Sequence, residues 1–209
     1  MSGWQDVYAD LAGLGFVIIA AAQDTGGEAA AREWYDQAAA TYVTLVDESH
    51  AVSSLFGLVN VPSAVWIDET GRIRRIDEGA YATVHTMGDF EFGRADYAPM
   101  VVDWVTRGEQ SEHVQATPPL EGLKVANTDA ALADPTFKLG VYFHQHGDAG
   151  KANRYWEAAQ ALDPRSWNYA RQDWSFTPEQ AGANWQEKYE SGQGAPYYRP
   201  IEGLDPGTP

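Results

Sequence analysis

Residues 61–73 have the sequence VPSAVWIDETGRI, which combines an X-Pro step, two short apolar runs and a turn. Val61-Pro62 comes first and leads into the apolar run Ser63–Ile67. The Asp and Gly of Asp68-Glu-Thr-Gly71 are typical turn residues, because Asp hydrogen-bonds to the local backbone and Gly accepts positive φ. A second short strand then runs from Arg72 to Arg75. The pattern predicts a strand-turn-strand unit that a proline opens.

Upstream of this unit, the apolar periodicity alternates between helix and strand. Gly13 and Gly15 separate a first helix from an apolar run without alternation, which is typical of a buried parallel strand. We interpret Thr25-Gly-Gly-Glu28 as a helix capping box. The expected elements are a helix over 4–14 with Trp4, Val7, Tyr8 and Leu11 on one face, a strand over 16–20, a helix over 25–40 with the stripe Ala30, Trp34 and Ala38, a strand over 42–46, and a short helix over 50–56 closed by Gly57.

Downstream, residues 80–96 show no clear period and are expected to form a loop. Pro99 starts a helix that carries Val101, Trp104 and Val105 and stops at Gly108. The alternation of helices and strands predicts an α/β fold. We divide the chain into an α/β domain over 1–110, a linker over 111–131, a helical region over 132–190 and a Gly- and Pro-rich tail over 191–209.

Residues 133–166 carry a separate pattern of small and aromatic residues. This pattern resembles one tetratricopeptide repeat: Leu139-Gly140, Phe143, Gly147-Asp148, Ala152, Trp156, Ala159 and Pro164 occur in the order and spacing of that repeat. Small residues allow two antiparallel helices to approach, while aromatic rings fill the space between them. Since one repeat cannot bury its own face, we expect a helical hairpin docked on the α/β domain rather than a peptide-binding array. The later aromatics, from Trp167 to Tyr189, are expected to continue that packing.

The composition limits the classes of function. The net charge of −16 disfavours binding to nucleic acid or to anionic lipid. The apolar runs are too short to span a membrane, and the first residues lack a signal peptide, so we expect a cytoplasmic protein. The 209 residues contain no cysteine, which excludes disulfides, thiolate metal sites and thiol nucleophiles from these residues.

Residues 4–107 are similar to the TlpA/ResA-type redoxins of the thioredoxin-like superfamily, which are close to the AhpC/TSA-like redoxins. The resemblance is carried by Gln23-Asp24 after a strand, the helix with Trp34, and the segments 42–47, 55–62 and 67–73 in family order and spacing. It implies a thioredoxin-like fold, thiol–disulfide or peroxide chemistry, and a cis peptide bond before Pro62. In that family Val61 and Pro62 would bind a peptide or thiol substrate.

One part of the family pattern is missing from this chain. A central strand and a Trp-Cys-x-x-Cys motif would precede the segment that starts at Trp4, so the strand between the Phe16 and Ala64 strands is absent. Two buried strand edges would then lack partners, which is costly. Either the chain is an N-terminally truncated form of a thiol or selenol enzyme, which we favour, or it is a cysteine-free relative with a rearranged sheet. In the truncated case, we expect poor solubility or self-association.

Other candidate sites are weak. His144 and His146 lie two residues apart and face different sides of a helix, so we interpret them as surface or packing residues, and we treat His50 and His85 as isolated. We assign no catalytic residue, no metal ligand and no cofactor. The sequence therefore predicts a redoxin relative that is redox-inactive as written. The alternative is a non-catalytic interaction module that holds a protein or peptide at the Pro62 groove or on the helical hairpin.

Overall fold

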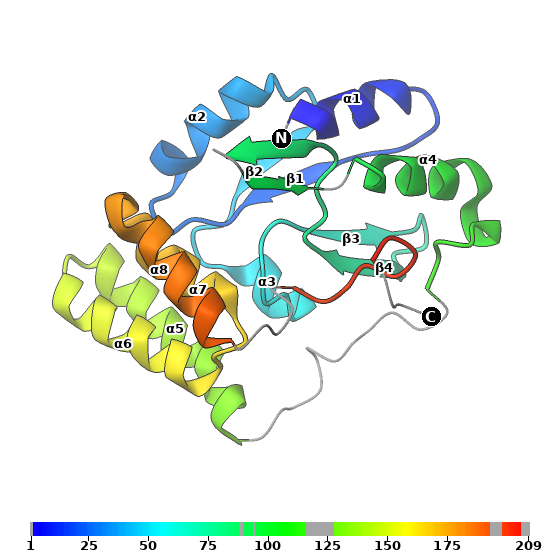
Figure 1. Cartoon of the computed structure of the whole chain (residues 1–209). Helices are drawn as coiled ribbons and strands as arrows, with labels where there is room; N and C mark the ends of the chain where they lie inside the picture. Colours follow the sequence, from blue (N-terminus) through cyan, green and yellow to red (C-terminus); the bar gives the residue numbers. More distant parts are fainter. Residues whose placement is uncertain (1, 88–89, 94, 116–127, 193–197, 206–209) are drawn as a thin grey trace.

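The predicted strand-turn-strand unit is present in the computed structural model as β3 (Ser63–Ile67) and β4 (Ile73–Glu78), paired antiparallel (Figure 1). Asp68 builds the turn, because its Oδ1 accepts hydrogen bonds from the amides of Thr70 and Arg72, both at 2.9 Å. Gly71 has a φ of +81°, which favours glycine there. The structure describes residues 2–87, 90–93, 95–115, 128–192 and 198–205.

The described strands form three separate pairs. The strand β1 (Ile19–Ala22) lies parallel to β2 (Val43–Val46), with Ile19 opposite Val43. A third pair, β5 (Val84–Met87) and β6 (Phe90–Gly93), is an antiparallel hairpin within the segment that we expected to be a loop. No ladder joins β1 to β3 within the described residues. The chain is therefore mixed α/β, as predicted, without a single continuous sheet in its described part.

One apolar core lies between β3–β4 and two helices, α1 (Ser2–Asp10) and α4 (Tyr97–Arg107). The apolar face predicted for the first helix is confirmed by the burial of Val7 and of Leu11 just after the helix. The helix predicted at Pro99 begins two residues earlier and ends before Gly108, where the 3-10 turn η1 (Gly108–Gln110) follows. The buried residues of this core are Val7, Leu11, Trp66, Ala80, Tyr97, Met100, Val101 and Ile201.

Three predictions for the N-terminal half are wrong. The strand expected at 16–20 begins at Ile19, and it is not buried: Ile19 is 64% exposed. The helix expected at 25–40 is α2 (Glu28–Ala38), whose N-cap is Gly27 without a side-chain hydrogen bond, so Thr25 forms no capping box. The side chain of Trp34, which we placed on the apolar stripe, is 63% exposed.

The face of α2 that packs on the strands carries Ala31, Tyr35 and Ala38 instead. Ala31 and Ala38 are buried, and the Tyr35 hydroxyl lies 2.9 Å from the carbonyl oxygens of both Ala20 and Leu45. This hydroxyl fastens the helix to β1 and β2. The short helix α3 (Ala51–Phe56) ends as predicted at Gly57, which has a φ of +62°.

The described part of the C-terminal half contains four helices, seen together at one side of Figure 1: α5 (Thr128–Gln145), α6 (Ala149–Leu162), α7 (Trp167–Ser175) and α8 (Pro178–Ser191). The predicted hairpin is present as α5 and α6, around buried Phe137, Ala152, Trp156 and Ala159. A Cβ atom on Gly140 would overlap the indole ring of Trp156, so the close approach of the two helices requires glycine. Among the described helices, none is long and apolar enough to cross a membrane.

Residues 198–205 belong to the expected tail, yet they pack on the α/β half. Ile201 is fully buried in the core with Tyr97 and Met100. Its amide donates to Oδ2 of Asp205 at 2.6 Å, which closes a turn at this end of the chain. In Figure 1 this red segment runs beside β4.

Candidate functional site

The peptide bond between Val61 and Pro62 is cis, as predicted, and it lies in the loop between α3 and β3. The Gly79 amide donates to the Pro62 carbonyl at 2.7 Å. This hydrogen bond makes Pro62 and Gly79 a hydrogen-bonded pair. Facing residues of an antiparallel ladder alternate between hydrogen-bonded and non-hydrogen-bonded pairs, so the bond determines which residues of β3 face β4. Ala64 and Trp66 therefore bond to β4, while the backbone groups of Ser63 and Val65 point away from it.

The same reasoning applies to β1. The amides of Val43 and Asp47 donate to the carbonyls of Ile18 and Ala22, at 3.2 and 2.8 Å. Since successive residues of a strand alternate in direction, the amides and carbonyls of Ile19 and Ala21 face away from β2. The inner edges of β1 and β3 are therefore both open within the described residues. We call these two edges, Ile19 with Ala21 in β1 and Ser63 with Val65 in β3, the open edges.

The outer edge of β4 is covered, in contrast. The Gln115 amide donates to the Arg74 carbonyl at 3.0 Å, and the Gln115 side chain accepts from the Ile76 amide at 3.3 Å. Gln115 thus bonds to two backbone groups of that edge, whereas no described strand pairs with the β3 edge. An open edge is a template for pairing with another extended chain.

The loop before Pro62 is held by groups from two directions. Its Val59 amide donates to Oε1 of Glu78 at 2.8 Å, and its Val59 carbonyl accepts from the amides of Trp167 and Asn168 at the start of α7. The Asn168 side chain donates to the Leu58 carbonyl at 2.7 Å. The first turn of α7 has amides without helical acceptors, and this loop supplies the acceptor. Sequence reasoning missed this role of α7, since the sequence around Trp167 shows only aromatic packing.

A second contact between the two halves is centred on His50. Its Nε2 lies 2.9 Å from Oγ1 of Thr25, and its ring meets the Phe137 ring edge to face at 4.8 Å. The Thr25 amide donates to the Gln172 side chain at 2.9 Å. Burial lowers the pKa of His50 from 6.5 to about 4, although the carboxylates of Asp47, Asp24 and Asp134 act in the opposite direction. His50 is therefore a neutral group that joins α3 to the helical region.

Buried polar atoms without partners lie in the same region. Nδ1 of His50, both side-chain polar atoms of Asn60, and Oδ1 of Asn168 are buried and make no hydrogen bond to the described residues. Unpaired buried groups of this kind are costly and are rare in folded proteins. Asn60 immediately precedes Val61, so the polar region borders the β3 edge.

The α5–α6 hairpin packs on the α/β half through the same region around His50. The Ser54 hydroxyl donates to Oδ1 of Asp134 at 2.6 Å, and Phe137 of α5 packs on His50. This agrees with the prediction of a hairpin docked on the α/β half. His144 stacks near Phe176 and Trp156, and His146 stacks on Tyr142, so both pack against aromatic rings. The side chain of His85 lies outside the described residues.

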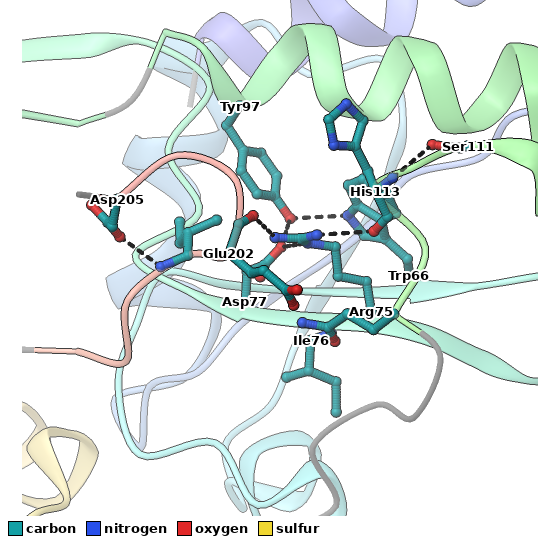
Figure 2. Close-up of polar contacts among 11 residues, drawn as sticks. Trp66, Arg75, Ile76, Asp77, Tyr97, Ser111, His113, Glu202 and Asp205 are labelled. Carbon is teal, nitrogen blue, oxygen red and sulfur yellow. Dashed lines mark hydrogen bonds and ion pairs between the residues drawn. The ribbon is translucent and has the colours of Figure 1, made fainter. Parts of the chain in front are cut away.

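The buried polar network of β4 is shown in Figure 2. Nε of Arg75 lies 2.5 Å from Oδ2 of Asp77, which also accepts from the Tyr97 hydroxyl at 2.7 Å. The Trp66 indole donates to the Tyr97 oxygen at 2.9 Å. Arg75 donates further to the carbonyls of His113 and Glu202, at 2.9 and 2.6 Å. Burial, and then the nearby Asp77, raise the pKa of Tyr97 well above its usual value of 10, so its hydroxyl stays protonated and can donate.

This network holds the fold together. Each of its side chains is hydrogen-bonded, and the network connects β3, β4, α4 and the C-terminal segment. Within the described part of the chain, no group of three His, Asp or Glu side chains lies close enough together to hold a metal ion. Of the arrangements described above, the pair of strand edges presents backbone groups that no described strand pairs with.

In comparisons with known proteins, no protein-family model, curated protein or solved structure matches the chain.

Proposed function

We propose that this chain is a thioredoxin-like redoxin domain that is redox-inactive as a 209-residue polypeptide, and that it binds an extended protein segment by strand addition between β1 and β3. The observation that carries the proposal is that, among the described residues, β1 and β3 each pair with a strand on one side only. Backbone donors and acceptors of Ile19, Ala21, Ser63 and Val65 face the open edges. Strand addition would satisfy these groups with main-chain hydrogen bonds.

The side chains around the β1 edge support an apolar partner segment. Val17 and Ile19 are mostly exposed, and Val43 and Leu45 on the neighbouring strand β2 are about half-exposed. Exposed apolar groups that lie together are typical of interaction surfaces. The net charge of −16 opposes the close approach of a second copy, so a segment that combines apolar and basic residues is the favoured partner.

Site-directed prolines test the proposal. Peptides selected from a random library against the purified chain are first measured for affinity to the wild type. Ala21→Pro removes an amide that faces the open edge of β1, while the amides that bond β1 to β2 remain. Thr44→Pro is the matched control, because the Thr44 amide faces the outer edge of β2.

We expect Ala21→Pro to weaken peptide binding at least tenfold and Thr44→Pro to leave it unchanged. Binding should also slow amide hydrogen exchange at Ile19, Ala21, Ser63 and Val65. If Thr44→Pro alone abolished binding, or if selection yielded no peptide that protects these amides, strand addition between β1 and β3 would be refuted.

A second candidate is a thiol or selenol redox enzyme whose catalytic motif precedes Met1. The same observation favours it, because a strand between β1 and β3 followed by a Trp-Cys-x-x-Cys motif is the part that the resemblance lacks. Reading the nucleotides upstream of Met1 separates the two candidates. An in-frame strand with a Cys or selenocysteine motif supports the enzyme, and the longer protein should then reduce insulin and no longer bind the added peptide. An unrelated upstream region favours the binding module.

A further inference from the structure

The C-terminal segment 198–205 follows β4 in the antiparallel direction, residue by residue. Tyr198 lies against Gly79, Arg199 reaches Glu78, and the Glu202 carbonyl accepts from Arg75 at 2.6 Å. Figure 2 shows the Glu202 end of this segment beside Arg75 and Asp77. These contacts use side chains on at least one partner, so the segment lies along β4 without extending its ladder.

The Tyr198 end of the segment occupies a site with two distinct parts. The first part is Gly79, which has a φ of +71°; three atoms of the Tyr198 ring lie 3.1–3.2 Å from the position that a Cβ would take. A ring can therefore lie flat on this glycine, and any side chain there would displace it. The Gly79 amide bonds to Pro62, so the ring lies beside the end of the β3 open edge.

The second part is Glu78, whose side chain is 1% exposed. Its Oε1 is held by the Val59 amide, which leaves Oε2 directed at Nε of Arg199, 3.4 Å away. A buried carboxylate requires a charged or hydrogen-bonding partner, and a guanidinium group supplies both. The site thus presents a flat backbone surface for a ring next to a carboxylate for a cation.

The two ends of the segment are held very differently. Ile201 is fully buried, whereas the Arg199 side chain is 36% exposed and its ion pair is long. Because the Glu78 carboxylate is buried, losing its cation without replacement would be costly, whereas another cation can take the place of Arg199. The Tyr198–Arg199 end is therefore the more accessible end, and a partner that brings its own cation to Glu78 can replace it while Ile201 stays in the core.

We propose that Gly79 and Glu78 form a binding site for an aromatic residue followed by arginine in an extended polypeptide. Tyr198 and Arg199 fill this site from within the chain, and a partner segment with the same pair displaces them. The identity of the partner rests on the proposed function, since the site adjoins the β3 open edge at Pro62. The site itself is inferred from the contacts that Tyr198 and Arg199 make with Gly79 and Glu78.

The test removes the two side chains that fill the site and leaves Ile201 unchanged. In the full chain carrying Tyr198→Ala and Arg199→Ala, the amide signals of Glu78 and Gly79 are followed by NMR while acetyl-Tyr-Arg-amide is added. We expect saturable shifts at millimolar dipeptide in this double variant and at least tenfold weaker binding to the wild type, whose own pair competes. Acetyl-Tyr-Glu-amide is the matched probe, and it should not bind because its carboxylate meets Glu78.

Three results would overturn the site: no shift at Gly79 in a folded double variant, equal binding of the Tyr-Glu probe, or equal binding to the wild type. Adding Ala21→Pro to the double variant separates this proposal from strand addition. That change should leave dipeptide binding intact, so the failure of one proposal is distinguishable from the failure of the other. A thermal unfolding curve with a single transition establishes that the double variant is folded.

Discussion

Nε2 of His50 lies 2.9 Å from Oγ1 of Thr25, and this pair joins two loops that follow the parallel strands β1 and β2. Thr25 follows β1 and His50 follows β2, so their side chains meet at the carboxyl ends of both strands. Gln172 and Phe137 of the helical region pack against the same pair. The contact therefore links strand pairing in one half of the protein to helix packing in the other.

This contact makes stability dependent on pH in a defined direction. His50 has a pKa of about 4 in the folded chain and about 6.5 when unfolded. The unfolded chain binds the proton first, so the stabilisation is fully present above pH 6.5 and is lost as the pH falls toward 4. The loss amounts to about 3 kcal/mol.

Urea unfolding between pH 7.5 and 4.5 measures this effect. The free energy of unfolding of the wild type should fall more steeply with decreasing pH than that of His50→Gln. His146→Gln, at an exposed histidine, should keep the slope of the wild type. Parallel curves for the wild type and His50→Gln would show that His50 is not a buried neutral group.

Gly140→Ala should destabilise the helical region. The added Cβ would overlap the Trp156 ring, and overpacking of this kind costs about 1–3 kcal/mol. Gly182→Ala is the matched control, because it also lies within a helix and its Cβ would have no neighbour within 4 Å. It should stabilise the protein by up to about 1 kcal/mol through helix propensity. Equal effects of the two changes on urea unfolding would contradict the close packing of α5 on α6.

Ile201→Ala should destabilise the α/β half even though Ile201 lies eight residues from the end of the chain. Removing a fully buried isoleucine side chain costs about 2–5 kcal/mol. Leu14→Ala, at a largely exposed apolar residue, should change the free energy of unfolding by less than about 0.5 kcal/mol. A neutral Ile201→Ala would mean that the C-terminal segment does not contribute to the core.

Tyr97→Phe should also be destabilising, because it leaves the Trp66 indole and the Asp77 carboxylate each without one partner. Unsatisfied buried groups cost about 1–3 kcal/mol. The same change at Tyr142, which is half-exposed, removes no described hydroxyl bond and should be near neutral. Thermal unfolding of the two variants compares them directly, and equal midpoints would argue against the network in Figure 2.

The purified 209-residue protein should show no disulfide reductase or peroxidase turnover. Its residues include no cysteine, so it has no thiolate to attack a disulfide or a peroxide. Insulin reduction with dithiothreitol, followed by turbidity, gives the measurement, with a cysteine-containing thioredoxin as the positive control. Turnover above the dithiothreitol background in a metal-free preparation would contradict this account of the chemistry.

The sequence alone was sufficient wherever a structure depends on near neighbours. Asp68 and Gly71 determine the β3–β4 turn, Gly57 ends α3, and the small residue at Gly140 brings α5 close to α6. In each case the hydrogen bonds or contacts involve residues within one turn or one hairpin of each other. Short-range patterns of this kind are visible as spacing in the chain.

Tertiary structure decided the rest, because burial depends on partners that are distant in sequence. Thr25 has the spacing of a capping residue, yet its amide bonds to Gln172, 147 residues away, and its hydroxyl bonds to His50. Ile201 lies in a Gly- and Pro-rich segment, yet it completes a core built mainly by residues 7–101. The apolar run that precedes and includes Ile19 indicates a buried strand, but the described residues supply no neighbour at its inner edge. The residue type determines how strongly a side chain favours burial. Only the fold determines whether another part of the chain is in place to bury that side chain.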